Sequence, residues 1–168
     1  MSIADLILPE FDEEIAITRR VLERVPDDRV EWRPHPKSFP MGHLAQLVAR
    51  LPGWVALTLT RTELDLAPVS GPGFPGYSFE RTATLLAEFD RNAAAAREAI
   101  SQAGDADFDV PWTLKKAGET LFTQSRYQVL RSMVFNHLVH HRAQLGVYLR
   151  LVDVPVPQMY GPTADEGK

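Results

Sequence analysis

The chain has 168 residues, of which 45% are hydrophobic and 24% are charged, a composition typical of a globular domain with its own core. Its formal net charge is −4, from 18 Lys and Arg against 22 Asp and Glu, and it has no basic block, so we expect no nucleic acid partner. The lack of cysteine excludes disulfides, thiolate metal sites and cysteine nucleophiles.

The N-terminal segment does not have the pattern of a signal peptide. Residues 1–10 carry Asp5 and Glu10 and have no basic segment ahead of a long apolar run. No stretch approaches the ~18 consecutive apolar residues of a membrane span. We therefore expect one cytoplasmic domain, residues 1–168, with no membrane partner.

The first helical pattern runs from about Ile3 to Val25. Its apolar stripe includes Ile7, Phe11, Ile15, Val21, Leu22 and Val25. Pro26 and Asp27 stop it, and a proline-fixed connector without helical period, residues 30–37, follows.

The second helical pattern has a clear start signal, because Ser38 would cap it and Pro40 would lie in its first turn. Its apolar face consists of Leu44, Leu47, Leu51, Trp54 and Val55. Pro52 lies inside this pattern and predicts a kink. Residues 67–76, with the sequence APVSGPGFPG, form a long loop, either a lid over a site or a plain connector.

The third helical pattern starts near Ser78, with Glu80 suited to the positive helix end, and Gly104 ends it. Its residues at alternating spacings of four and three form one seam: Thr82, Leu86, Phe89, Ala93, Ala96 and Ile100. Between Val110 and Phe122, the alternation of apolar and polar residues permits a short hairpin.

The fourth helical pattern runs from about Gln124 to Val152, and residues from about 153 to 168 form an extended acidic tail. Its stripe consists of Leu130, Val134, Leu138, Leu145, Tyr148 and Val152. Four helices with one apolar face each predict an all-α fold, an antiparallel four-helix bundle with a long crossover connection.

Three of the five histidines lie close together in the fourth helix, in the sequence NHLVHH at residues 136–141. At roughly 100° per residue, His137 and His141 differ by about 40° in direction and lie one turn apart on the core side. Both imidazoles can then reach one metal ion. His140 is also one turn from His137, but it points about 100° away from His141, so we expect it outside the ligand set.

The third ligand must come from elsewhere, since two imidazoles seldom hold a metal alone. His43 lies on the rim of the second helix's apolar stripe, one turn before Leu47, and is the natural candidate. The direction of His35, in the proline connector, is not fixed by the sequence. The alternative is that these histidines are hydrogen-bonded core residues that bind no metal.

Two segments resemble the DinB-like family of four-helix metalloproteins: residues 41–54 (MGHLAQLVARLPGW) and residues 136–150 (NHLVHHRAQLGVYLR). Residues 154–157 (VPVP) and 160–166 (YGPTADE) are similar to one of its branches. The resemblance implies a bundle that is often dimeric, with a metal held by one histidine of the second helix and two of the fourth. These positions match His43, His137 and His141.

The family includes thiol S-transferases, such as those that use mycothiol or bacillithiol, and hydrolase-like members, and many members have no assigned activity. Three neutral imidazoles leave a divalent ion with an open position, the pattern of catalytic sites. That position can activate water or bind a thiolate. Imidazole suits Zn²⁺ and Ni²⁺, and geometry does not exclude Mn²⁺ or Fe²⁺.

We therefore expect a metal-dependent enzyme that acts on a small molecule, with a low-molecular-weight thiol as one candidate partner. The alternatives are a metal-binding protein without turnover and a dimeric helical interaction protein. No carboxylate lies one or two turns from the histidines on their face, so no catalytic base is assigned. Gln144 and Arg50 are candidates for substrate contacts, Arg50 toward an anionic substrate. The alternatives are a polar residue at the bundle rim for Gln144 and a solvated arginine for Arg50.

Several surface expectations follow from the same helical directions. Asn136 and Arg142 are expected to face solvent or a partner. A homodimer is expected to form through a second apolar side of the fourth helix, unless this side only widens the core. That side consists of Met133, Val147 and Leu151. The aromatic residues that could line a pocket mouth are Trp54, Phe74, Trp112 and Tyr160.

Overall fold

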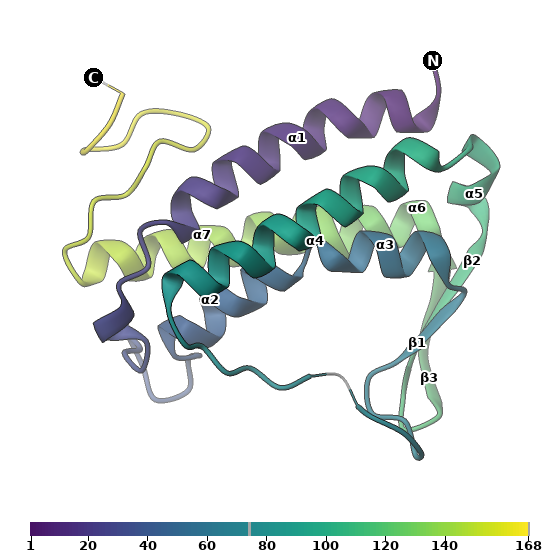
Figure 1. Cartoon of the computed structure of the whole chain (residues 1–168), viewed down its shortest axis with the longest axis horizontal. Helices are drawn as coiled ribbons and strands as arrows, with labels where there is room; N and C mark the ends of the chain where they lie inside the picture. Colours follow the sequence, from purple (N-terminus) through teal and green to yellow (C-terminus); the bar gives the residue numbers. More distant parts are fainter. Residues whose placement is uncertain (74, 168) are drawn as a thin grey trace.

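The computed structural model describes residues 1–73 and 75–167. Its helices lie alongside one another, with a small sheet at the end where the N-terminus lies (Figure 1). The elements in chain order are α1 (Ile3–Leu22), η1 (Asp27–Arg29), α2 (Met41–Arg50), α3 (Gly53–Thr60), β1 (Glu63–Asp65), α4 (Thr82–Gln102), α5 (Asp105–Asp109), β2 (Pro111–Lys116), β3 (Glu119–Ser125), α6 (Arg126–Val129), the π-helical η2 (Leu130–Phe135) and α7 (Asn136–Leu151).

The sheet corrects the prediction of an all-α fold, because the chain is mostly helical but not purely so. The predicted hairpin is confirmed: β2 and β3 pair antiparallel, and Ala117 and Gly118 have the positive φ values, 53° and 81°, that a two-residue hairpin turn favours. Strand β1 was not predicted. It pairs parallel with β2, and its Asp65 carboxylate accepts backbone N–H bonds from Ala117 and Gly118 at 3.0 and 2.8 Å.

The second helical pattern is broken into two helices, which confirms the effect predicted for Pro52. Helix α2 ends at Arg50 and α3 begins at Gly53, because proline cannot donate the helical hydrogen bond. The cap predicted at Ser38 is wrong. Instead, carbonyl oxygens of the connector, at Trp32 and Val30, accept the first backbone N–H groups of α2, both at 2.9 Å.

Helix α4 begins at Thr82, four residues after the predicted start. The Thr82 backbone N–H donates to the Asp27 carboxylate at 2.6 Å, and the Thr82 hydroxyl donates to the Val25 carbonyl at 2.6 Å. The hydrogen bonds that Asp27 accepts from the Thr82 hydroxyl, at 2.7 Å, and from the Thr82 backbone N–H lower its pKa. The cap of α4 is therefore supplied by a residue 55 positions away in the sequence, which a local pattern cannot reveal.

The apolar interior consists of two main groups of side chains. One lies between the C-terminal part of α1, helix α2, the start of α4 and helix α7, and the other between the N-terminal part of α1, helix α3, the end of α4 and η2.

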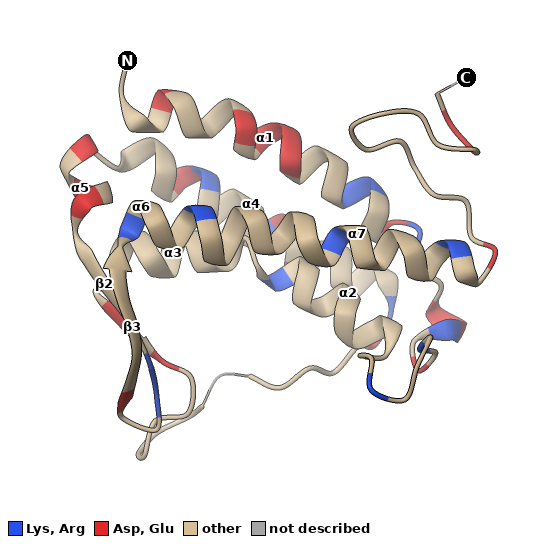
Figure 2. Ribbon diagram, turned by 180° about the vertical axis from the view of Figure 1, so that it is seen from behind, with Lys and Arg blue, Asp and Glu red and all other residues tan. Residues whose placement is uncertain are grey.

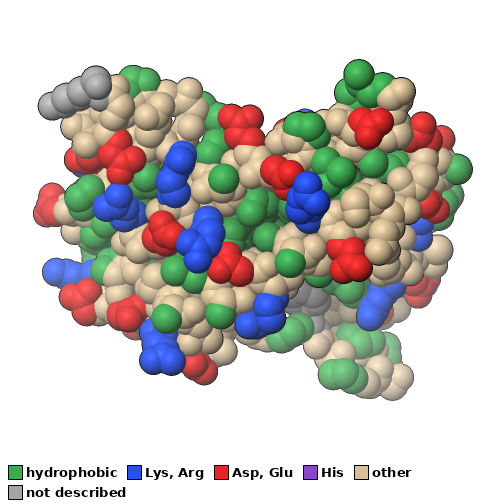
Figure 3. Space-filling model, turned by 45° about the horizontal axis from the view of Figure 1, so that its top comes forward, with side chains coloured by type: hydrophobic (Ala, Val, Ile, Leu, Met, Phe, Trp, Pro, Cys, Tyr) green, Lys and Arg blue, Asp and Glu red, His purple; other side chains and the backbone are tan. Residues whose placement is uncertain are grey.

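On the face that carries α1 and α4, side chains of both charges are interspersed with hydrophobic ones (Figure 3). Ion pairs Arg19–Asp90 and Asp12–Arg97, both at 2.9 Å, join these two helices there. In the described part of the chain, none of the helices is both long enough and apolar enough to cross a membrane.

The π-helical turn η2 changes the direction of side chains along the fourth helix, because a π-turn holds more residues than an α-turn. Met133 therefore packs inward against the group formed by Trp112, Leu114 and Val129. Val147 and Leu151 are 57% and 56% exposed. The prediction that Met133 shares their outer face is wrong.

Arg142 is 1% exposed, so the expectation that it faces solvent or a partner is also wrong. Its guanidinium forms an ion pair with the buried Glu14 of α1 at 2.7 Å and donates to the Thr18 hydroxyl at 3.0 Å. The Tyr160 hydroxyl of the tail accepts a hydrogen bond from the Arg142 guanidinium and donates one to the Glu14 carboxylate at 2.7 Å. This group joins α1, α7 and the tail.

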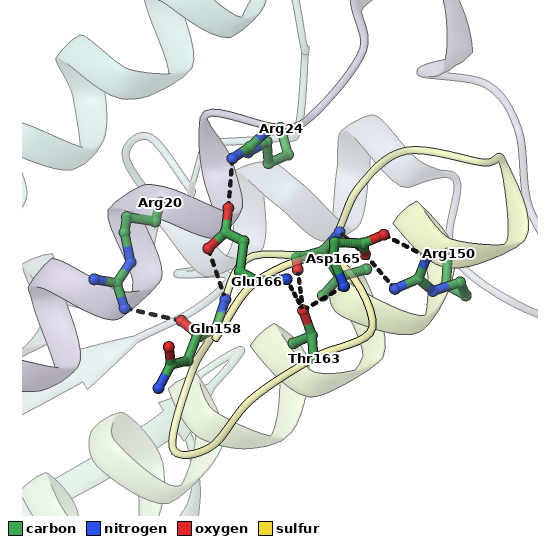
Figure 4. Close-up of polar contacts among 8 residues, drawn as sticks. Arg20, Arg24, Arg150, Gln158, Thr163, Asp165 and Glu166 are labelled. Atoms are coloured by element: carbon green, nitrogen blue, oxygen red, sulfur yellow. Dashed lines mark hydrogen bonds and ion pairs between the residues drawn. The ribbon is translucent and has the colours of Figure 1, made fainter. Parts of the chain in front are cut away.

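The C-terminal tail folds back along the ends of α1 and α7 (Figure 4). Glu166 pairs with Arg24 at 2.8 Å, and Asp165 pairs with Arg150 while accepting the Val156 backbone N–H. The hydrogen bond from Arg150 holds the pKa of Asp165 below its usual range. The tail is thus part of the folded domain through residue 167.

We predict that Glu14→Ala lowers the free energy of unfolding by about 3 kcal/mol, because it leaves the Arg142 charge buried without its partner. The matched control is Glu13→Ala, an exposed position on the same helix, which should change stability by less than about 0.5 kcal/mol. Urea unfolding of both variants checks this. Equal stability of Glu14→Ala and wild type would show that the ion pair contributes nothing.

Candidate metal centre

His137 and His141 lie one turn apart on α7, and their Nε2 atoms are 2.8 Å apart. Both side chains are half-buried, and their ring centroids are 4.5 Å apart. The structure thus brings together the two histidines that helical spacing had paired. Two ring nitrogens converge on one point.

The other ring nitrogen of each histidine contacts an oxygen. His141 Nδ1 lies 2.8 Å from the Gln144 Oε1 atom, and His137 Nδ1 lies 3.3 Å from the Met133 carbonyl oxygen. A carbonyl oxygen only accepts hydrogen bonds, so each of these contacts is a hydrogen bond when Nδ1 carries the ring proton. In that tautomer each Nε2 has a free lone pair. This is the outer hydrogen-bonding pattern typical of metal-binding histidines.

Burial lowers the pKa of both His137 and His141 from the ordinary value of 6.5. The positive charge of a neighbouring protonated histidine would lower each further. Both rings are therefore neutral at pH 7, the form in which imidazole binds metals. The chemistry of this donor pair fits a divalent cation.

His140 and His35 are placed apart from this pair. His140 is exposed, and its ring stands edge-on to His141 at a centroid distance of 4.8 Å. His35 is exposed in the connector, where its Nδ1 accepts the Lys37 backbone N–H at 3.1 Å.

Helix α7 itself has no Asp or Glu, as Figure 2 shows by the lack of red along it. No carboxylate ligand can come from this helix.

His43, the predicted third ligand, lies on α2 in an aromatic stack. Its ring is parallel to Phe39 at a centroid distance of 4.4 Å and to Tyr77 at 3.9 Å. Burial lowers its pKa, so it too is neutral at pH 7. Within residues 1–73 and 75–167, no three His, Asp or Glu side chains are close enough together to share a metal ion. The structure therefore does not bring His43 to the other two histidines.

A cavity of about 260 Å³ lies beside His137. It lies between α2, α3, the sheet, η2, the start of α7 and the loop before α4, and it is lined by Leu47, Arg50, Leu51, Trp54, Leu66, Tyr77, Leu114, Met133 and His137. Tyr77 thus contacts both the cavity and His43. Of the aromatic residues expected at a pocket mouth, Trp54 lines this cavity, whereas Trp112 is fully buried and Tyr160 belongs to the Arg142 group. Phe74 lies outside the described residues.

Arg50, one of the two candidates for a substrate contact, is engaged by protein groups. Its Nε atom pairs with Glu88 at 2.7 Å, and its Nη1 atom donates to the Gly76 carbonyl at 2.8 Å. Its guanidinium also lies 5.3 Å from the Tyr77 ring centre. Gln46 adds to this clamp by accepting the Ser78 backbone N–H at 2.7 Å. Arg50 thus holds the crossover loop, the segment between β1 and α4, beside the cavity.

Gln144, the other candidate, contacts His141 rather than the cavity. Tyr77 and Glu88 were not among the residues predicted for the site. Tyr77 belongs to a loop without periodicity, and Glu88 is a charged residue on a helix, so neither carried a local signal. A signal was available in one respect only, since Tyr77 is an aromatic residue next to a proline- and glycine-rich segment.

Comparison with known proteins places the chain in a recognised group. The family model described as the DinB superfamily matches residues 10–145. A DinB-like protein from Bacillus cereus ATCC 10987 has 20% identity and a TM-score of 0.67, with 91% of this chain and 95% of that chain covered. The DinB-like protein YjoA from Bacillus subtilis has 15% identity and a TM-score of 0.68, with 92% and 97% covered. These two likenesses concern the fold. No curated protein matches the sequence.

Proposed function

The chain belongs to the DinB superfamily, and we propose that it binds one divalent metal ion and acts as a metal-dependent enzyme on a small molecule. His137 and His141 would be the first two ligands, and His43 the third. A thiol S-transferase or a hydrolase is the reaction class we favour, with a low-molecular-weight thiol as the candidate co-substrate of the former.

The observation that supports the metal site most strongly is the 2.8 Å separation of the two Nε2 atoms. Two lone pairs at this distance repel unless a proton or a cation lies between them. In the metal-free chain one neutral ring can donate its Nε2 proton to the other ring's Nε2, and a divalent cation can take the place of that proton. Two nitrogens on one tetrahedral zinc ion, with bonds of about 2.0–2.1 Å, are about 3.3 Å apart, so a small ring rotation is sufficient.

His43 would complete the set from α2, a helix that packs against α7. To do so, its ring has to leave the stack between Phe39 and Tyr77. Tyr77 lies on the loop between β1 and α4, where it both stacks on His43 and lines the cavity. A movement of His43 toward the other two histidines would therefore also change this wall of the cavity. Imidazole nitrogens favour Zn²⁺ or Ni²⁺, and Mn²⁺ or Fe²⁺ are compatible with the same set.

The protein's own groups have definite roles in this proposal. Gln144 and the Met133 carbonyl would hold the two imidazoles in the tautomer that exposes Nε2. The apolar walls of the cavity would exclude water beside His137. A bound divalent ion would supply Lewis acidity and lower the pKa of a water or thiol at its open position. The cavity favours an enzyme over a protein that only stores metal, because storage needs no adjacent substrate volume.

A homodimer is a second proposal, supported by Val147 and Leu151. These apolar side chains are one turn apart on α7 and more than half exposed. Exposed apolar residues at helical spacing are typical of helix–helix interfaces. The same face would serve a non-catalytic interaction protein.

We predict about one equivalent of divalent metal per chain in protein purified without a histidine tag. His137→Ala and His141→Ala should each weaken metal binding by more than about 100-fold. The residues that hydrogen-bond to metal ligands contribute roughly 10–100-fold in affinity, and the loss of a ligand itself should cost more. His140→Ala and His35→Ala are the matched controls and should retain metal binding. Metal analysis after dialysis measures this. Full stoichiometry in His141→Ala would exclude the assignment, and full stoichiometry in His43→Ala alone would remove only the third ligand.

We predict that metal affinity is constant from about pH 8 to about pH 7 and falls in acid. A ligand imidazole must be unprotonated, and burial lowers the pKa of His137 and His141, so protons compete only below about pH 6.5. Below both pKa values, the affinity should fall by about ten-fold per pH unit for each histidine ligand. Competition titrations with a chelator of known pH dependence measure it. An affinity that stays flat down to about pH 5 rules out histidine ligation.

We predict that the wild-type chain sediments as a dimer and that Val147→Glu combined with Leu151→Glu sediments as a monomer. Two charges in the middle of an apolar interface would have to be buried without partners. Ala83→Glu combined with Ala87→Glu is the matched control, since both positions are exposed and one turn apart on α4. A dimeric Val147/Leu151 variant would place the interface elsewhere, and a monomeric wild type would contradict the dimer itself.

A further inference from the structure

The cavity beside His137 has walls that are apolar almost throughout. Six aliphatic, thioether or indole side chains form them: Leu47, Leu51, Trp54, Leu66, Leu114 and Met133. They come from α2, α3, the segment after β1, strand β2 and η2. The remaining lining groups are Tyr77, Arg50 and His137. Any group of a ligand that enters this space meets hydrocarbon on most sides.

The single charged side chain of the lining does not make the cavity a site for anions. The Arg50 guanidinium is paired with the Glu88 carboxylate at 2.7 Å, and both side chains are mostly buried. It also donates to the carbonyls of Pro75 and Gly76 at 3.2 and 2.8 Å. A ligand carboxylate would have to displace these partners or remain unpaired, and an unpaired buried charge costs several kcal/mol.

The volume of about 260 Å³ limits the size of the occupant. In another protein, an apolar cavity of roughly 150 Å³ accepts benzene. The cavity described here therefore accommodates a group of about one to two fused rings. Trp54, Tyr77 and the Met133 thioether also provide the ring and sulfur contacts that favour an aromatic group over a linear alkyl chain.

We propose that this cavity binds an uncharged aromatic group of one or two rings, as the recognition element of the substrate. The statement that this group belongs to the substrate, with the reacting atom next to His137, rests on the proposed metal-dependent function. The binding of the aromatic group itself does not. Leu114, Leu66 and Met133 then determine specificity through the volume that they leave.

The test is a titration of the full-length, metal-free chain with 2-naphthylmethanol and with its anionic counterpart 2-naphthoate. Methionine labelled with ¹³C at the methyl group provides a local signal, because Met133 lines the cavity whereas Met1 is 98% exposed. We expect a saturable shift of the Met133 methyl with 2-naphthylmethanol, at least ten-fold weaker binding of 2-naphthoate, and no shift of Met1. Equal or tighter binding of 2-naphthoate overturns the proposal, as does the lack of a saturable Met133 shift.

Filling the cavity should remove this binding. Leu114→Trp does so from β2 but changes a side chain that is only 4% exposed, so the half-buried Leu66→Trp is the second variant if the first does not fold. We expect at least ten-fold weaker binding of 2-naphthylmethanol in either variant. The control is Leu121→Trp, on the neighbouring strand and 53% exposed, which should bind as wild type does. Undiminished binding in a folded Leu66→Trp variant overturns the proposal.

The two proposals fail separately in this design. No metal is added, so a failure of the metal site leaves the Met133 shift unaffected. Conversely, a failure of the aromatic site leaves the metal content of the same protein unaffected. His141→Ala joins the two measurements, since His141 does not line the cavity and this variant should lose metal while it retains 2-naphthylmethanol binding.

Discussion

The Nε2 atoms of His137 and His141 meet on a half-buried face of α7, and the candidate site is built around this contact. Spacing of four residues places the rings together, burial keeps them neutral, and oxygens of Met133 and Gln144 lie within hydrogen-bond distance of Nδ1, on the far side of each ring. The two nitrogens are close enough to share one proton or, as we propose, one metal ion.

The rest of the fold supplies the surroundings of that pair. Arg142 directly follows His141 in α7 and forms a buried ion pair with Glu14 of α1. Helix α7 therefore cannot turn about its axis at this point without separating a buried charge from its partner. The Arg50–Glu88 pair holds the crossover loop over the cavity, and Tyr77 of that loop stacks on His43. The position of this loop, the ring of His43 and the shape of the cavity therefore depend on one another. Movement of the loop would change all three.

Much of this could be predicted from the sequence wherever the determining contacts are local. The helical stripes, the break at Pro52, the hairpin and the pairing of His137 with His141 all follow from periodicity or residue type. The failures have nonlocal causes. Asp27 caps α4 across 55 residues, Glu14 neutralises Arg142 from another helix, and the three-residue β1 is too short for any pattern. The π-helical turn displaced Met133 because a constant 100° per residue does not hold through it. The stack that holds His43 depends on Tyr77, 34 positions further along.

We propose that His137 and His141 bind a metal together through Nε2, and ¹H–¹⁵N correlation of the imidazole nitrogens in zinc-loaded protein tests this coordination. This measurement identifies the protonated and the metal-bound nitrogen of each ring separately. We expect both rings to be protonated at Nδ1 in the zinc-loaded protein, and we expect zinc to shift the Nε2 resonances of His137 and His141 but not those of His140. Coordination of either ring through Nδ1, or a zinc-induced shift of His140 without one of His141, would contradict it.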